Sequence, residues 1–161
     1  MVTHQVEAPN IVVWFEGSRA GRLALLRAQQ MAAAADTHLT VLTIAIHERV
    51  IGCGRCLQGT VLWNLEMEKM AREDLHQAQK LLGASAEAEF EVMVGDPVEQ
   101  IAATAKSRHA DTIVLPWQRN RRLDPPHRRN VAPRLEAHGT WQVIVAPEPS
   151  RHHRAELDTA P

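Results

Sequence analysis

The residues best suited to chemistry are two cysteines and a histidine in the first half of the chain. Cys53 and Cys56 are separated by two residues, and His47 precedes them. Two thiolates at this spacing are a natural chelating pair for zinc or iron, with His47 as a third ligand and a fourth from another group or a second chain. Redox cycling of the thiols, favoured by the neighbouring Arg55, is an alternative. A third possibility is that both cysteines are reduced and have no function.

A second group of candidates lies in a basic segment between Trp117 and Arg134. This segment holds six arginines and one aspartate, a local charge of +5 in a chain whose net charge is -1. Arginine can hold phosphate through paired side-chain hydrogen bonds. The segment is therefore interpreted either as an anion site that includes Arg119 and Arg129 or as a solvated loop. Trp117 could stack on a base, but one tryptophan and a balanced total charge argue against a nucleic-acid partner.

Alternating strands and helices must position these residues. Buried strands are expected where apolar residues run together, and helices where they recur every three or four positions. The expected elements of the first half are a strand at 11–15, a helix at 20–35, a strand at 39–46, a loop at 47–60 and a helix at 61–82. Ser18 is placed as the N-cap of the first helix, and Gly83 ends the second.

The second half continues the alternation. Its expected elements are a strand at 87–94, a helix at 97–108, a strand at 112–115, a short helix between Asn130 and Gly139, and a strand at 141–146. The strand at 87–94 alternates polar and apolar residues, which is typical of a sheet edge. Asn130 is predicted to cap the short helix. Residues 1–147 are expected to form one domain, and residues 148–161 a flexible tail.

This order of elements predicts an α/β fold, a Rossmann-like, doubly wound sheet of five mostly parallel strands flanked by about four helices. Ligands of such sheets bind beyond the carboxyl ends of the strands, where the strand order reverses. The residues expected there are Glu16, Gly17 and Ser18 after the first strand, the end of the second strand at 44–47, and the loop that starts at Pro116.

Composition excludes several classes of protein. The chain has 161 residues, of which 45% are hydrophobic and 23% charged, as expected for a single soluble domain. The start lacks a signal peptide, and the longest apolar stretches fall far below the ~18 residues that span a bilayer, so we expect a cytoplasmic protein without membrane insertion. The chain lacks a Ser-His-Asp order and an H-E-x-x-H motif, which argues against a hydrolase or a metalloprotease.

Three stretches resemble the universal stress protein family, in an order and spacing that cover roughly residues 10–147. They are IVVWFEGS at 11–18 with the Ala- and Leu-rich segment after it, VGDP at 94–97, and ADTIV at 110–114 with the closing strand. The resemblance implies a Rossmann-like fold and a stress or regulatory role rather than catalysis. It also implies a homodimer joined through the last strand, Trp141 to Ala146.

Many members of that family bind ATP through a loop after the fourth strand that reads Gly, two residues, Gly, nine residues, then Gly with Ser or Thr. In this register Pro116 and Arg119 stand at the first two glycines, and Arg129 with Asn130 at the final pair. Proline lacks an N–H, and arginine side chains fill space that the phosphates would need. Glu16 replaces the family's aspartate. These departures argue against ATP binding in the usual way, although Asn130 could preserve the helix start and its attraction for anions.

The sequence thus predicts a non-enzymatic, dimeric stress-response or regulatory protein that acts through a partner protein or an anionic ligand such as a phosphorylated small molecule, with no cofactor firmly assigned. One alternative is a metal-binding or thiol-redox sensor that uses Cys53, Cys56 and His47, with zinc as the candidate metal. A further alternative is that the protein still binds a nucleotide and slowly hydrolyses ATP. Its rebuilt phosphate site would consist of Glu16, Gly17, Ser18, Arg119, Arg129 and Asn130.

Overall fold

The computed structural model describes residues 10–48, 54–83, 87–118 and 130–149, with the backbone alone for residues 54–57. Strands and helices alternate throughout these ranges, as the sequence predicts. The elements in chain order are β1 (Asn10–Trp14), α1 (Arg19–Ala35), β2 (His38–Ala45), α2 (Gly54–Leu82), β3 (Ala88–Val94), α3 (Pro97–Ser107), β4 (Ala110–Leu115), α4 (Val131–His138) and β5 (Gln142–Val145).

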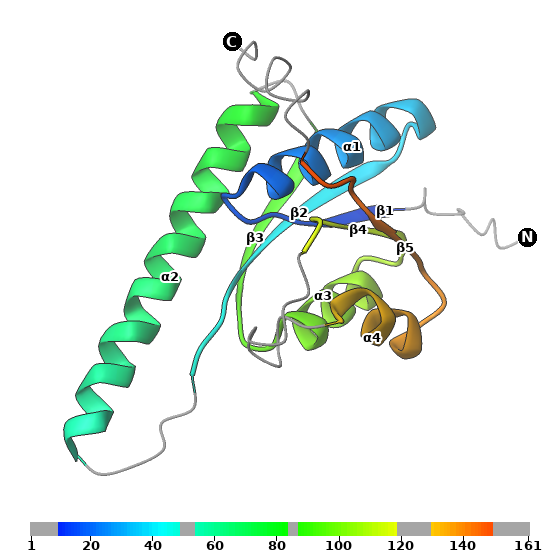
Figure 1. Cartoon of the computed structure of the whole chain (residues 1–161). Helices are drawn as coiled ribbons and strands as arrows, with labels where there is room; N and C mark the ends of the chain where they lie inside the picture. The colour runs from blue at the N-terminus through cyan, green and yellow to red at the C-terminus, as the bar shows by residue number, and fades with distance from the viewer. Residues whose placement is uncertain (1–9, 49–53, 84–86, 119–129, 150–161) are drawn as a thin grey trace, which may run out of the picture.

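The five strands form one parallel sheet in the order β3-β2-β1-β4-β5. The chain moves outward from β1 to β2 and β3, then returns across the sheet to β4 and β5, so the sheet is doubly wound (Figure 1). β3 lies at one edge, which confirms the inference from its alternating pattern, and β5 lies at the other. The predicted fold class is therefore confirmed, with every strand pair parallel.

Two helices cover each face of the sheet. On one face, α1 and α2 pack against side chains that include Ile11, Val13 and Phe15 of the first strand and its end. On the other face, α3 and α4 pack around Trp14, together with Leu42 of β2 and with Ile113 and Leu115 of β4. Successive residues of β1 thus point to opposite faces, and both faces are buried, as expected for a strand in a parallel sheet.

The outer edge at β3 carries charged residues. Glu89 and Glu91 are two residues apart and therefore share one face of the strand. Arg108, directly after α3, contacts both carboxylates, with Nη1 2.5 Å from Glu89 Oε2 and Nη2 hydrogen-bonded to Glu91 Oε1. The end of α3 is thereby tied to the edge strand.

The predicted loop at 47–60 is wrong in its extent, because α2 already begins at Gly54. Residues 54–60 contain two glycines and no apolar stripe, so neither propensity nor periodicity indicates a helix there. The other end was predicted correctly, since Gly83 has a φ of 74° in the left-handed region that favours glycine. Among the described residues, no helix is both long and apolar enough to cross a membrane. Residues 150–161 of the predicted tail lie outside the described ranges.

Candidate functional site

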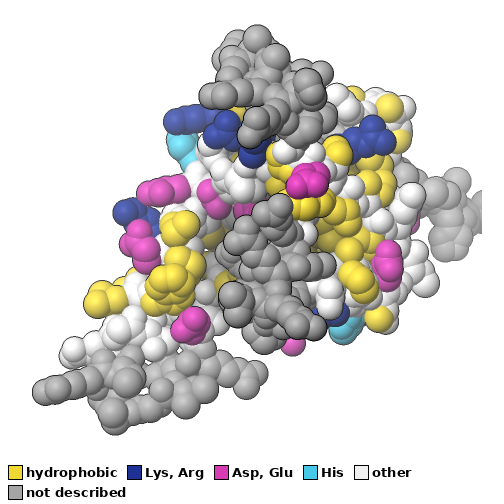
Figure 2. All heavy atoms as spheres, viewed as in Figure 1, with side chains coloured by type: hydrophobic (Ala, Val, Ile, Leu, Met, Phe, Trp, Pro, Cys, Tyr) yellow, Lys and Arg dark blue, Asp and Glu magenta, His cyan; other side chains and the backbone are white. Residues whose placement is uncertain are grey.

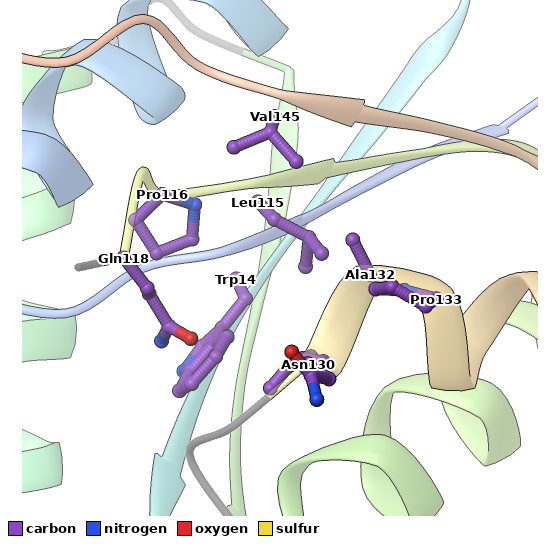
Figure 3. Close-up of a pocket in the computed structure, with 9 residues that line it drawn as sticks. Trp14, Leu115, Pro116, Gln118, Asn130, Ala132, Pro133 and Val145 are labelled. Atoms are coloured by element: carbon purple, nitrogen blue, oxygen red, sulfur yellow. The ribbon is translucent and has the colours of Figure 1, made fainter. Parts of the chain in front are cut away.

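The strand order reverses between β1 and β4, and a small cavity lies where these two strands end. Its volume is about 100 Å³. The end of β1 and the segment after β4 form one part of the wall, and the start of α4 forms the other (Figure 3). The lining residues are Trp14, Leu115, Pro116, Gln118, Asn130, Val131, Ala132, Pro133 and Val145. This is the place where the topology predicts a ligand.

The turn between β1 and α1 is held by its own side chains. Ser18 is the N-cap of α1, and its Oγ accepts a hydrogen bond from the backbone N–H of Gly21 at 3.0 Å. The same hydroxyl donates to Glu16 Oε1 at 3.1 Å. The predicted cap is therefore confirmed, and one serine both starts the helix and orients the Glu16 carboxylate.

The same turn is also tied to α2 through Asp74. The backbone N–H of Gly17 donates a hydrogen bond to the Asp74 carboxylate, and partial burial raises the pKa of this carboxyl above its ordinary value. A Cβ at position 17 would collide with Asp74 Oδ1, so the close approach of the two segments depends on glycine. The sequence interpretation missed Asp74, although an acidic residue amid the buried positions of α2 is a usable signal.

Trp14 separates the first cavity from a second. The second has a volume of about 60 Å³ and is bounded by Glu16, the end of β2 and α2, and Trp14 lines both. The Trp14 side chain is 3% exposed. Its prediction as a core residue is confirmed, but the sequence did not reveal that this indole lies at the centre of the crevice.

The α4 wall is built differently from the β1–α1 turn. Asn130 occupies the predicted N-cap position, but its φ of 51° and ψ of 39° are left-handed and its side chain makes no capping hydrogen bond. The capping role predicted for it is therefore wrong, because a side-chain cap requires an extended backbone. Arg134 Nη2 lies 3.3 Å from Asp96 Oδ1 and pairs with the residue that caps α3. Arg119 and Arg129 lie outside the described residues.

The candidate metal ligands are only partly covered by the structure. His47 follows β2, and its Nε2 lies 3.0 Å from Glu68 Oε1 on α2. Cys56 lies in the first turn of α2 with only its backbone described, and Cys53 is outside the described ranges. Within the part of the chain that is described, no group of three or more His, Cys, Asp or Glu side chains could hold a metal ion. The metal assignment remains a prediction.

Comparison with known proteins agrees with the fold. The model of the universal stress protein family matches residues 8–147. The structure resembles the universal stress protein UspA from Lactobacillus plantarum, with a TM-score of 0.71 and 19% identity over 88% of this chain and 99% of that one. It also resembles a family member from Burkholderia pseudomallei, with a TM-score of 0.65 and 20% identity over 89% and 98% of the two chains.

A further similar structure is a universal stress protein in complex with cAMP, with a TM-score of 0.53 and 19% identity over 89% of this chain and 99% of that one. A search of curated proteins gives no match. The family model covers most of the chain, and the doubly wound sheet agrees with it. The chain therefore belongs to the universal stress protein family.

Proposed function

We propose that this protein is a non-enzymatic, cytoplasmic stress-response protein that does not take up ATP in the usual way of its family. It acts instead through a partner protein or a small anionic ligand. The observation that carries this proposal is the division of the switch-point crevice by Trp14. Among the described residues, the two cavities that Trp14 lines measure about 100 and 60 Å³. Sites for cofactors and drug-sized ligands usually measure about 300–1,000 Å³.

The chemistry of the crevice supports the same conclusion. Pro116 begins the segment after β4 and has no N–H to offer a phosphate. The N-terminus of α4 faces the larger cavity through Asn130 and Val131, and a helix N-terminus attracts anions. A small anion that the arginines at 119 and 129 help to hold is the ligand that these features favour.

Isothermal titration calorimetry tests the proposal with ATP, cAMP and inorganic pyrophosphate as probes. The cAMP complex of a similar protein makes this nucleotide the appropriate competitor. We expect ATP and cAMP to bind no more tightly than about 1 mM, which corresponds to about -4 kcal/mol. Micromolar binding of either nucleotide would contradict the proposal. Arg119→Ala and Arg129→Ala would then each weaken binding by about 1.5–3 kcal/mol if arginines have replaced the glycine loop.

The expected homodimer uses β5, and the sheet supports this proposal. β5 is the last strand of the sheet, and its sequence QVIV contains no charged residue. An uncharged edge strand offers backbone hydrogen-bonding groups to a second chain. Val145→Lys places a charge on this edge, and we expect it to lower dimerisation through β5 in sedimentation velocity experiments.

A thiol-redox role is the second candidate, and the start of α2 favours it over a metal site. The helix begins at Gly54, between the two cysteines of the C-x-x-C sequence. A helix N-terminus stabilises a thiolate, and this placement is found in disulfide oxidoreductases. Thiol titration after mild oxidation, with Cys53→Ser as the control, measures whether the pair forms a disulfide. Stoichiometric zinc in protein purified without chelator, lost in Cys53→Ser, would favour the metal site instead.

A further inference from the structure

Trp14 places a large aromatic side chain where the sheet topology predicts a ligand. It is the last residue of β1 and is 3% exposed. Its indole lines the first cavity beside Leu115 and the second cavity beside Ile44. Figure 3 shows the ring between the side chains of Gln118 and Asn130, which also line the first cavity. This one side chain therefore lies between two cavities at the point where the strand order reverses.

The indole takes up at least as much space as the cavities beside it. Among the described residues, these cavities measure about 100 and 60 Å³. Removal of a buried leucine side chain can leave a void of about 150 Å³ that binds benzene, and an indole is larger than a leucine side chain. Without the indole, the two cavities would join into one space of about 300 Å³, which is the lower end of the range for small-molecule sites. Much of the surface of this protein is polar and charged, whereas the space around Trp14 is enclosed by residues of both kinds (Figure 2).

The joined space would combine apolar walls with a few polar groups. Its apolar lining includes Leu115, Val131, Ile44 and Ala71. The first cavity adds the amides of Gln118 and Asn130, and the second adds the carboxyl groups of Glu16 and Asp74. Apolar walls favour a flat aromatic ring, and polar groups that meet its edge favour ring nitrogens and amino groups. A purine base has both features, and like the indole it consists of two fused rings.

We propose that Trp14 determines the ligand specificity of the crevice: its indole occupies the place of a purine-sized ring and excludes nucleosides, which leaves room for a small anion only. This inference rests on the proposed function, because it takes the native ligand to be a small anion, and it assigns the exclusion of nucleosides to one residue. A nucleoside has no phosphate, so the missing N–H of Pro116 does not matter for its exclusion. The exclusion is steric and should follow the size of the side chain at position 14.

Isothermal titration calorimetry with adenosine compares the wild type with Trp14→Ala, Trp14→Val and Trp14→Phe. We expect Trp14→Ala to lower the dissociation constant of adenosine by more than about tenfold and Trp14→Val to lower it less. Trp14→Phe should leave it close to the wild-type value, because a phenyl ring still lies between the cavities. The control is Ile113→Ala, which removes a buried side chain from the same face of the sheet, at a residue that lines neither cavity. This control should not gain binding.

Two outcomes of the titration would overturn the proposal: no gain in adenosine binding when Trp14 is made smaller, or an equal gain in Ile113→Ala. Far-ultraviolet circular dichroism checks that each variant folds. If Trp14→Ala does not fold, Trp14→Val carries the test, because a β-branched residue suits a strand. Micromolar binding of adenosine by the wild type would contradict the proposed function, whereas millimolar binding by the wild type and all variants would contradict this inference alone.

Thermal unfolding with indole as the probe tests whether the space stays open in the variant. Indole should raise the unfolding midpoint of Trp14→Ala and leave that of the wild type unchanged, since only the variant has room for it. An unchanged midpoint in Trp14→Ala would mean that the crevice closes when the side chain is removed. Stabilisation by indole without any gain in adenosine binding would reveal a void with no preference for a nucleoside. Either result would overturn the proposal.

Discussion

Two walls beside Trp14 follow different rules: the β1–α1 turn, which bounds the second cavity, and the start of α4, which lines the first. At the β1–α1 turn, Ser18 caps the helix and orients Glu16, and Gly17 is held by Asp74. At the start of α4, Asn130 is left-handed and makes no capping hydrogen bond with its side chain. The first wall is held by hydrogen bonds among its own residues and by one from Gly17 to Asp74 of α2, whereas the second follows how α4 packs on the sheet. Local sequence therefore predicts the first wall better than the second.

The largest effect is expected from Trp14→Ala, which removes the indole between the two cavities. Loss of a buried aromatic side chain should lower the free energy of unfolding by about 3–5 kcal/mol. Chemical denaturation measures this change. Trp117→Ala is the control, because Trp117 is only half-buried and should cost about 1 kcal/mol. Equal losses of unfolding free energy in the two variants would mean that Trp14 packs no better than Trp117.

The next largest effects on stability are expected from alanine substitutions at Gly21 and Gly59, two glycines within helices. A Cβ at Gly21 would collide with the backbone carbonyl oxygen of Glu16, whereas a Cβ at Gly59 meets nothing within 4 Å. Gly21→Ala should therefore destabilise the protein by about 1–3 kcal/mol through overpacking of the turn. Gly59→Ala should stabilise it by about 0.5–1 kcal/mol, since alanine is the better helix former. Thermal unfolding of both variants checks the sign, and a stabilising Gly21→Ala would show that the turn is not tightly packed.

Ser18→Ala tests whether the first wall depends on its cap. Removing the acceptor for the Gly21 N–H should cost about 1 kcal/mol in urea denaturation. Ser18→Asn keeps an N-cap oxygen and should recover the loss to within about 0.5 kcal/mol. If Ser18→Asn were as unstable as Ser18→Ala, the stabilising contact would be the hydrogen bond to Glu16 rather than the cap.

The smallest effect on stability is expected from the titration of Asp74 with pH. Because burial raises the pKa of this carboxyl in the folded protein above its ordinary value of 3.8, the folded state binds the proton more tightly than the unfolded state. The contribution of Asp74 to stability therefore falls as pH rises from about 4 through the folded-state pKa. Asp74→Asn removes this dependence and can still accept the hydrogen bond from Gly17. The stability of the variant relative to wild type should rise over that pH range, and a fall would contradict the assignment.

A feature of this structure could be predicted when residues close together in the sequence determine it, and was missed when residues far apart in the sequence determine it. The strands were predicted because burial on both faces leaves continuous apolar runs, and Ser18 because a cap is a local signal. Asp74 could not be matched to Gly17, since they are distant in sequence and only the packing of α2 brings them together. The start of α2 at Gly54 was missed for a related reason, because its first turns bury no apolar side chain of the described residues.

The charged pairs at β3 also bear on how far the sheet can grow. Glu89 and Glu91, clamped by Arg108, place carboxylates along the edge where a further strand would have to align. β5 at the opposite edge carries no charge in its sequence QVIV. Among the described residues, one edge is thus blunted and the other is uncharged, so the proposed addition of β5 to a second copy would be self-limiting. A dimer of that kind would end in a single continuous sheet shared by two chains, with a β3 edge at each end, and would not propagate into a fibre.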